Sequence, residues 1–260
     1  MLLLVKYGGN AMHQLEADPV LADLASLAGE GHHVVLVHGG GPAIDAALKE
    51  RGIVEKRIAG LRMTGRASLD VVEFVLCATV NKALVRALCA LGLAAVGISG
   101  EDGPTLIARQ SPPVEGESLG FVGEVEEARP VLIDSLLEHR FVPVVAPLGV
   151  ARDGSTAYNI NGDTAAGALA GALRVDAFVA ITDVPKIRRR VDDPNSAVDM
   201  LTAGEAEEWR AVGSLAGGMI PKVDSAFVAL RAGAKRAMVA GAGPEAIRNA
   251  LGGAGTELKL

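Results

Sequence analysis

Short apolar runs alternate with longer stretches of helical periodicity along most of the chain. The apolar runs predict buried strands at residues 2–6, 34–38, 93–99, 142–146, 177–181 and 236–240. The helical periodicity predicts helices at residues 16–29, 42–51, 66–91, 130–140, 161–174 and 219–232. Strands that alternate with helices indicate a mostly parallel sheet covered by helices on both faces. We therefore predict an α/β fold, a three-layer sandwich.

Two segments interrupt this alternation. Residues 103–126 contain two short strand-like runs around Pro112 and Pro113, which is typical of a hairpin or a meander. Residues 57–64 are similarly irregular. We expect both segments to form a rim over one end of the sheet, where open parallel sheets bind their ligands.

The composition fits one domain over residues 1–260, without a linker. A net charge of −6 and an aromatic content of 3% argue against a general nucleic-acid binder. The first apolar run meets Lys6 at once and is too short for a signal peptide or a membrane span, so we expect a cytoplasmic protein without membrane contact. Cys77 and Cys89 fit neither a zinc site nor a disulfide framework.

The second predicted strand ends in the turn His38-Gly39-Gly40-Gly41-Pro42. Glycines leave backbone N–H groups uncovered, and the helix that begins at the proline directs its positive end toward the same point. Such a turn can bind a phosphate or a carboxylate. It can equally be only a tight connection between a strand and a helix.

Two lysines lie at comparable places. Lys6 ends the first strand, next to a second glycine-rich turn with Gly8 and Gly9, and the ends of neighbouring parallel strands coincide. Lys222 lies just inside a helix, where a cation opposes the macrodipole unless it is solvated or has an anionic partner.

An extended segment with three polar residues precedes the predicted helix at 161–174. Asn159 and Asn161 alternate in this segment, so we expect them to point to one side. Asp163 follows at the start of the helix. Helix capping is the simpler interpretation of Asn161 and Asp163 when they are taken in isolation.

A further glycine-rich segment, residues 241–246, lies near the end of the sequence. Residues 241–246 match the G-x-G-x-x-A pattern of dinucleotide-binding folds. Only 14 residues follow Ala246, which predicts that no further strand and no ribose-binding acid come after it. The sequence also contains no G-x-x-x-x-G-K-[ST] motif of a P-loop nucleotidase.

Taken in order, these motifs resemble those of acetylglutamate kinases, in the amino acid kinase family. The matching segments are Lys6-x-Gly8-Gly9, His38-Gly39-Gly40-Gly41-Pro42, Gly60-Leu61-Arg62-Met63-Thr64, Gly97-Ile98-Ser99-Gly100-x-Asp102-Gly103, Leu119-Gly120-Phe121-Val122-Gly123-Glu124-Val125, Asn159-x-Asn161-x-Asp163 and Gly218-Met219-x-x-Lys222. Each motif is weak alone, whereas the ordered set spans nearly the whole chain and is specific to the amino acid kinase fold.

The resemblance implies ATP-dependent phosphorylation of the γ-carboxylate of N-acetyl-L-glutamate by direct in-line transfer, the second step of arginine biosynthesis. The implied catalytic residues are Lys6, Lys222, Asp163, Gly9 and Gly40, with Asp163 holding the lysines. The implied substrate-binding residues are Gly40, Gly41, Arg62 and Asn159. Such a transfer needs positioning and charge neutralisation rather than a catalytic base, because the acceptor is already an anion.

The resemblance also implies an ATP site and two lobes, one that binds the amino-acid substrate and one that binds ATP. The implied ATP-binding residues are Lys6, Gly8, Gly9, Thr182, Asp183 and Lys222. Mg²⁺ would be carried by the ATP phosphates, with no direct ligand from the protein. Roughly, residues 1–155 would form the amino-acid substrate lobe and residues 156–260 the ATP lobe. Lys186 stands where the family commonly has a glycine, so the turn after Asp183 departs from the family pattern.

Two alternative functions remain open. A related kinase phosphorylates 2-aminoadipate linked to a carrier protein and shares the fold and the lysines, although Gly41-Pro42 and Gly60-Leu61-Arg62 favour a free amino acid. A non-catalytic sensor of ATP or of an amino acid is the second alternative.

The resemblance finally implies an oligomer. Arginine-inhibited members of the family carry an extra amino-terminal helix that links dimers into hexamers, whereas this sequence opens on the predicted strand at residues 2–6. We expect an arginine-insensitive homodimer that pairs through the apolar face of helix 66–91.

Overall fold

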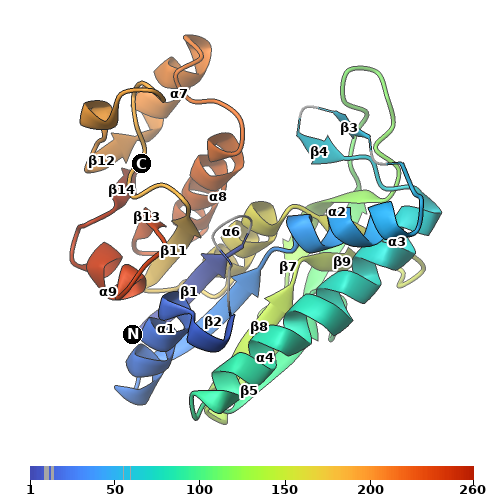
Figure 1. The fold of residues 1–260 in the computed structure, drawn as a ribbon, viewed down its shortest axis with the longest axis horizontal. Coiled ribbons are helices and arrows are strands. Elements are labelled where there is room, and N and C mark those ends of the chain that lie inside the picture. Colours follow the sequence, from blue (N-terminus) through green and yellow to red (C-terminus); the bar gives the residue numbers. More distant parts are fainter. Residues whose placement is uncertain (9–11, 13–14, 55, 59) are drawn as a thin grey trace.

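An eight-stranded sheet forms the centre of the molecule, and helices cover both of its faces (Figure 1). The computed structural model describes residues 1–8, 12, 15–54, 56–58 and 60–260. In sheet order the strands are β12 (Met200–Thr202), β14 (Thr256–Lys259), β13 (Ala237–Gly241), β11 (Ala177–Thr182), β1 (Leu2–Tyr7), β2 (His33–His38), β8 (Val142–Ala146) and β5 (Ala95–Ser99). All neighbouring pairs are parallel except β13 and β14. The predicted α/β fold is confirmed.

Alternate side chains of the central strands enter two separate cores. Leu4 of β1 is fully buried in the core beneath α5, α6 and α8, whereas Leu3 and Val5 are fully buried in the core beneath α1, α4 and α9. These helices are α1 (Pro19–Gly29), α4 (Asn81–Ala90), α5 (Val131–Glu138), α6 (Gly162–Ala172), α8 (Met219–Arg231) and α9 (Ala246–Leu251). Each such leucine or valine contributes about 1.5–3 kcal/mol through burial, which explains why the central strands are mostly apolar on both faces.

The helix predicted at 66–91 is continuous but not uniform. It consists of α3 (Arg66–Glu73), a π-helical segment (Phe74–Val80) and α4. The wider turn of a π segment rotates the following residues around the axis, so a spacing of three and four along the whole stretch is only an approximation.

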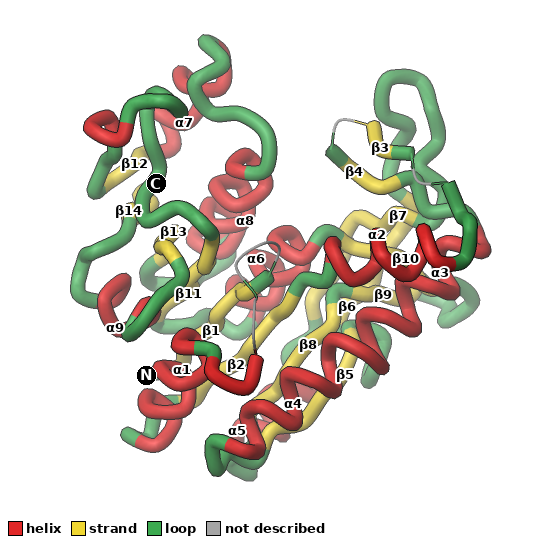
Figure 2. Tube along the Cα trace, viewed as in Figure 1, coloured by secondary structure: helices red, strands yellow, loops and turns green. Residues whose placement is uncertain are grey.

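The irregular segments of the sequence form a small barrel and a hairpin. The closed barrel contains β6 (Leu106–Gln110), β7 (Val122–Ala128), β9 (Leu148–Val150) and β10 (Ala157–Ile160). The strands β6 and β7 are antiparallel, as the hairpin prediction for residues 103–126 requires. The hairpin of β3 (Arg57–Ile58) and β4 (Leu61–Arg62) lies beyond α2 (Gly41–Glu50) at one end of the molecule (Figure 2).

The last residues of the chain contradict the prediction that no strand follows Ala246. The helix α9 has only six residues, and β14 then returns antiparallel to β13, so both elements fit into the final segment. A short α7 (Ala203–Ala211) and β12 were also not predicted. Within the described residues, no helix is long and apolar enough to cross a membrane.

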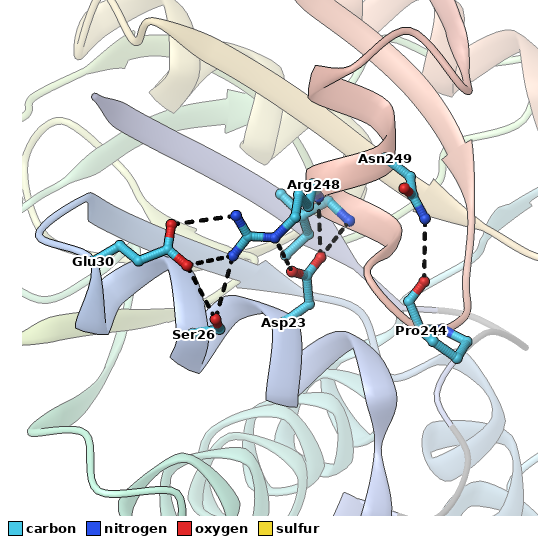
Figure 3. Close-up of polar contacts among 7 residues, drawn as sticks. Asp23, Ser26, Glu30, Pro244, Arg248 and Asn249 are labelled. Carbon is cyan, nitrogen blue, oxygen red and sulfur yellow. Dashed lines mark hydrogen bonds and ion pairs between the residues drawn. The ribbon is translucent and has the colours of Figure 1, made fainter.

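The helices α1 and α9 are joined although they are more than two hundred residues apart in the sequence (Figure 3). The buried carboxylate of Asp23 accepts hydrogen bonds from the backbone N–H groups of Ile247 at 2.7 Å and Arg248 at 3.0 Å. The guanidinium of Arg248 extends to Glu30 on the same side of α1. A carboxylate at the first turn of a helix supplies acceptors that the helix itself lacks, so Asp23 fixes α9 against α1.

Candidate active site

The register of the parallel strands brings several chain segments to one edge of the sheet. Lys6 pairs with Val37 of β2 and with Ala180 of β11, and Tyr7 pairs with His38. The helix α2 begins at this edge because it follows β2 directly. The helix α6 follows β10 of the barrel, and its first residue also lies at this edge. A Cβ placed on Gly162, the first residue of α6, would lie 3.7 Å from Cε of Lys6. The positive ends of two helices therefore flank the end of β1.

Two lysines from distant parts of the chain meet at one carboxylate. The Nζ atom of Lys6 lies 2.9 Å from Oδ1 of Asp163, and the Nζ atom of Lys222 lies 3.1 Å from Oδ2. Lys6 belongs to β1, Asp163 to α6 and Lys222 to the first turn of α8. Lys6 and Asp163 are each 5% exposed, so this is a buried ionic cluster with one net positive charge.

Burial and the neighbouring charges act in opposite directions on the pKa values of Lys6 and Asp163. Burial lowers the pKa of the Lys6 ammonium, and the Asp163 carboxylate opposes this effect. Burial alone would raise the pKa of Asp163, but Lys6 and Lys222 outweigh it and hold the pKa of this carboxyl below its usual value. The carboxylate is therefore ionised at neutral pH, and its two oxygens are committed to the two lysines.

The glycine-rich turns lie against each other beside this cluster. A Cβ on Gly8 would lie 2.6 Å from the backbone N of Gly39, so no side chain fits there. A Cβ on Gly40 would lie 2.6 Å from Cδ2 of Leu76. Within the described part of the chain, no protein acceptor takes the N–H groups of Gly40 and Gly41, which open the first turn of α2. Gly9, for which we predict catalytic and ATP-binding roles, lies outside the described residues.

The residues predicted to bind the amino-acid substrate meet through Thr64. The amide Nδ2 of Asn159 donates to Oγ1 of Thr64 at 3.2 Å, and that hydroxyl donates to the carbonyl of Arg62 at 3.1 Å. Arg62 is 8% exposed and forms an ion pair with Asp45 of α2. Arg62 and Asn159 are therefore linked through Thr64, and Arg62 also contacts α2, the helix that begins at Gly41.

Asn161 has other partners than Asn159. The Oδ1 atom of Asn161 accepts hydrogen bonds from the backbone N–H groups of Asp163 at 2.8 Å and Thr164 at 3.2 Å, so Asn161 is the N-cap of α6. The capping interpretation therefore holds for Asn161, and the shared orientation of Asn159 and Asn161 stays a prediction. Asp163, which was open to the same interpretation, contacts the lysines instead.

The predicted nucleotide residues follow β11 at the same edge of the sheet. Thr182 ends this strand, and its hydroxyl donates to Oδ1 of Asp183 at 2.9 Å. The backbone N–H of Ala242, after β13, donates to the carbonyl of Thr182 at 2.8 Å. Lys186 forms an ion pair with Asp199 and so is engaged within the protein.

The donor set around the cluster does not suit a resident divalent cation. No group of three or more His, Cys, Asp or Glu side chains that could hold a metal occurs among the residues that the structure describes. Both oxygens of Asp163 face ammonium groups, which repel a cation.

An open, mostly parallel sheet with a cationic, glycine-lined edge defines the protein as an α/β protein with an anion-binding site. The family model described as "Amino acid kinase family" matches residues 1–241. The chain belongs to the amino acid kinase family.

Individual relatives match nearly the whole chain. The acetylglutamate kinase of Methanopyrus kandleri is 42% identical over 238 residues, covering 90% of this chain and 93% of the relative. The acetylglutamate kinase of Brevibacillus brevis is 42% identical over 239 residues, covering 92% of this chain and 88% of the relative. Among solved structures, smu.665 from Streptococcus mutans superimposes with a TM-score of 0.82 at 28% identity, covering 99% of this chain and 98% of that one.

Two site residues were missed by the sequence reasoning. Thr64 was part of a matching motif but had no role assigned, because a hydroxyl beside an arginine gives no distinct pattern. Asn81 had a visible signal, since it occupies the same helix face as the fully buried Leu84 and Leu88 at spacings of three and seven. A polar side chain in such a stripe has hydrogen-bond partners inside the protein.

Proposed function

We propose that the protein catalyses ATP-dependent phosphorylation of the γ-carboxylate of N-acetyl-L-glutamate to N-acetyl-glutamyl 5-phosphate, the second step of arginine biosynthesis. The buried cluster of Lys6, Asp163 and Lys222 beside the glycine-rich turn carries this proposal. The acetylglutamate kinases that are 42% identical over about nine tenths of the chain support the choice of substrate.

The cluster suits the charge changes of phosphoryl transfer. The transferring group shares its negative charge between the leaving oxygen of ADP, its own oxygens and the attacking carboxylate. Lys6 and Lys222 supply positive charge in a poorly hydrated site. The N–H groups of Gly40 and Gly41, for which the described residues provide no acceptor, supply fixed dipoles. Asp163 opposes the lowering of the Lys6 pKa by burial and holds both ammonium groups in place.

The site needs no catalytic base. The γ-carboxylate of the acceptor is ionised at neutral pH and attacks the phosphorus atom directly, without a covalent enzyme intermediate. Asp163 is unsuited to accept a proton, because its pKa lies below the usual value and both of its oxygens contact lysines. The proposed chemistry thus uses positioning and charge alone.

The acceptor and the nucleotide approach the cluster from opposite sides. On the acceptor side, Arg62 offers a planar guanidinium to the α-carboxylate, Asn159 offers an amide to the acetamide group, and Gly41 offers an N–H. On the nucleotide side lie Gly8, which follows β1, Thr182, which ends β11, and Asp183 directly after it. Gly9 belongs to the same proposed set of nucleotide-binding residues. Mg²⁺ enters as part of the MgATP substrate. Residues 1–155 correspond to the acceptor lobe and residues 156–260 to the ATP lobe, and the central sheet runs through both.

The lysines provide the first test. We expect Lys6→Ala and Lys222→Ala each to lower kcat by about a hundredfold or more, because each removes a charge that stabilises the transition state. Lys235→Ala is the matched control, since it also breaks a lysine–aspartate pair, but the Lys235 side chain is 71% exposed and its partner Asp176 precedes β11, at the opposite end of the strands from Lys6. Near-normal turnover in both site variants would contradict the mechanism.

An acceptor panel provides the second test. The product is an acyl phosphate, which hydroxylamine traps as a hydroxamate. Free N-acetyl-L-glutamate, other acyl amino acids and carrier-linked 2-aminoadipate are offered in parallel with ATP. Preference for N-acetyl-L-glutamate supports the proposal, preference for the carrier-linked acceptor assigns the protein to the related kinase, and no hydroxamate with any acceptor indicates a non-catalytic sensor.

We also propose a homodimer that pairs through the helix of α3, the π segment and α4. The adjacent strand β5 is the edge of the main sheet, and its residues 95–98 are only partly buried. Phe74 and Leu91 at this side are 56% and 45% exposed. Light scattering checks the mass in solution. The use of ATP and a small biosynthetic substrate fits the cytoplasmic location that we propose.

A further inference from the structure

A buried histidine lies directly behind the glycine-rich turn. His38, the last residue of β2, is fully buried, and its Nδ1 lies 2.8 Å from the carbonyl oxygen of Gly39. Its Nε2 lies 3.1 Å from Nδ2 of Asn81, which is 1% exposed. The lysine mechanism leaves this side chain without a role, although an imidazole is costly to bury.

The hydrogen bonds around the ring define which nitrogen carries the proton. The Nδ2 group of Asn81 also faces the carbonyls of Val144 at 2.9 Å and Ile98 at 3.3 Å, so it is the amide nitrogen, which can only donate. A proton on Nε2 of His38 would face this donor, whereas an unprotonated Nε2 can share its two protons with the carbonyls, which favours the proton on Nδ1. Nδ1 faces the carbonyl oxygen of Gly39, which can only accept a hydrogen bond. The partners of both ring nitrogens therefore indicate the tautomer with the proton on Nδ1.

A third group fixes the orientation of the Asn81 amide. The ammonium of Lys82 lies 3.2 Å from Oδ1 of Asn81 and 2.9 Å from the carbonyl of Gly97. Gly97 leaves the required room, since a Cβ there would lie 1.9 Å from Oδ1 of Asn81 and 2.6 Å from Nζ of Lys82. The network thus runs from the edge strand β5 through α4 to the glycine-rich turn.

The network controls the peptide between Gly39 and Gly40. In a trans peptide the C=O and the following N–H point in opposite directions. The hydrogen bond from His38 holds the Gly39 carbonyl toward the protein interior, and the Gly40 N–H then points away from the ring. Without that bond this peptide could rotate readily, because glycine occupies both sides of it.

We propose that His38 is a positioning residue that aims the Gly40 N–H at the transferring phosphoryl group, with Asn81 selecting the required tautomer. This inference rests on the proposed kinase function. It extends the site beyond the groups that would touch the substrates and assigns a task to a buried polar network that crosses the sheet. Burial lowers the pKa of His38 to about 4, so the neutral ring that this task requires persists at neutral pH.

Two variants separate the two ends of the ring. In His38→Asn the amide nitrogen occupies the place of Nδ1 and can still donate to Gly39, whereas in His38→Gln the amide occupies the place of Nε2 and only the contact with Asn81 remains. We expect His38→Gln to lower kcat by about tenfold to a hundredfold at a nearly unchanged KM for both substrates. We expect His38→Asn to restore most of that loss.

A purely structural role would give a different result. Both variants break one end of the network, so they would then lose thermal stability and kcat to a similar extent. Equal loss of kcat in both variants, or wild-type kcat in His38→Gln, would overturn the proposal. A wild type that phosphorylates no acceptor would instead refute the proposed function and leave this comparison without a reaction to follow.

The tautomer is measured without reference to catalysis. Long-range ¹H–¹⁵N correlation spectra of the ligand-free wild type distinguish protonated from unprotonated imidazole nitrogens, and the His38→Asn spectrum identifies the His38 signals. We expect a protonated Nδ1 and an unprotonated Nε2 at neutral pH. A proton on Nε2 instead would overturn the proposal even if a variant failed to fold.

Discussion

Removing the charge of Asp163 tests the site most directly. In Asp163→Asn the two ammonium groups lose the carboxylate that lies 2.9 Å from Lys6 and 3.1 Å from Lys222. At an effective dielectric constant of about 20, two opposite charges about 3 Å apart attract by about 5 kcal/mol, and the cost of burying the ions offsets part of this. We therefore expect the free energy of unfolding at pH 7 to fall by about 3 kcal/mol.

The same variant changes the protonation of Lys6. Burial already lowers the pKa of this lysine, and Asp163 is the group that opposes the effect, so the pKa falls further in Asp163→Asn. We expect kcat to fall by about a hundredfold or more at neutral pH. Because lowering the pH restores the proton to Lys6, the ratio of variant to wild-type kcat rises as the pH is lowered from about 9 to about 6.5.

Steady-state kinetics across this pH range and urea unfolding at pH 7 provide the measurements. Asp224→Asn is the matched control, because its carboxylate also pairs with a cation, Arg210, but is 48% exposed. We expect this control to lose less than about 1 kcal/mol and to keep its kcat. A wild-type kcat in Asp163→Asn, or a kcat ratio that does not change with pH, would refute the role assigned to the buried carboxylate.

Two further predictions concern groups around the site, and a third concerns the contact between α1 and α9. The pKa of His38 is about 4 in the folded protein and 6.5 otherwise, so the unfolded state binds more protons between these values and stability falls as the pH falls through them. We expect this group to account for about 3 kcal/mol, seen as a weaker pH dependence of urea unfolding in His38→Asn than in the wild type. Gly8→Ala places a Cβ 2.6 Å from the backbone of Gly39 and should cost about 1–3 kcal/mol and lower kcat, whereas the control Gly29→Ala, with open space around it, should not destabilise the protein. Asp23→Ala removes the acceptor of the first turn of α9 and should lower stability by about 1–2 kcal/mol in thermal unfolding, with kcat and KM unchanged.

The main sheet could be predicted because its signal is local. Strands such as β1 and β11 are buried on both faces, so they read as continuous apolar runs of the right length. The same reasoning missed β14, whose four residues Thr256–Lys259 include two charged side chains. This segment is a strand because it pairs with β13 and β12. Its own residues do not indicate that pairing, because the partner strands lie elsewhere in the sequence.

The sequence singles out a site residue only where its residue type is unusual for its position in a strand or helix. Lys6 stood out because it precedes a glycine-rich turn at the end of a buried strand, and Lys222 because a cation in the first turn of a helix is unfavourable unless it is solvated or has an anionic partner. The sequence could not distinguish Asn161, which caps α6, from Asp163, which binds the lysines, since both residue types cap helices well. It also could not reveal the link from His38 through Asn81 to β5, because that link depends on distances across the sheet.

The ionic cluster draws on almost the full length of the polypeptide. Lys6 lies in the first strand, whereas Lys222 lies in the helix that precedes β13, and Asp163 between them binds both. During synthesis, a chain that has not yet reached residue 222 carries only one of the two cations, and a chain cut near residue 155 separates Lys6 from its carboxylate. The complete cluster therefore cannot form before residue 222 has been synthesised, and a chain that ends before this residue should not consume ATP.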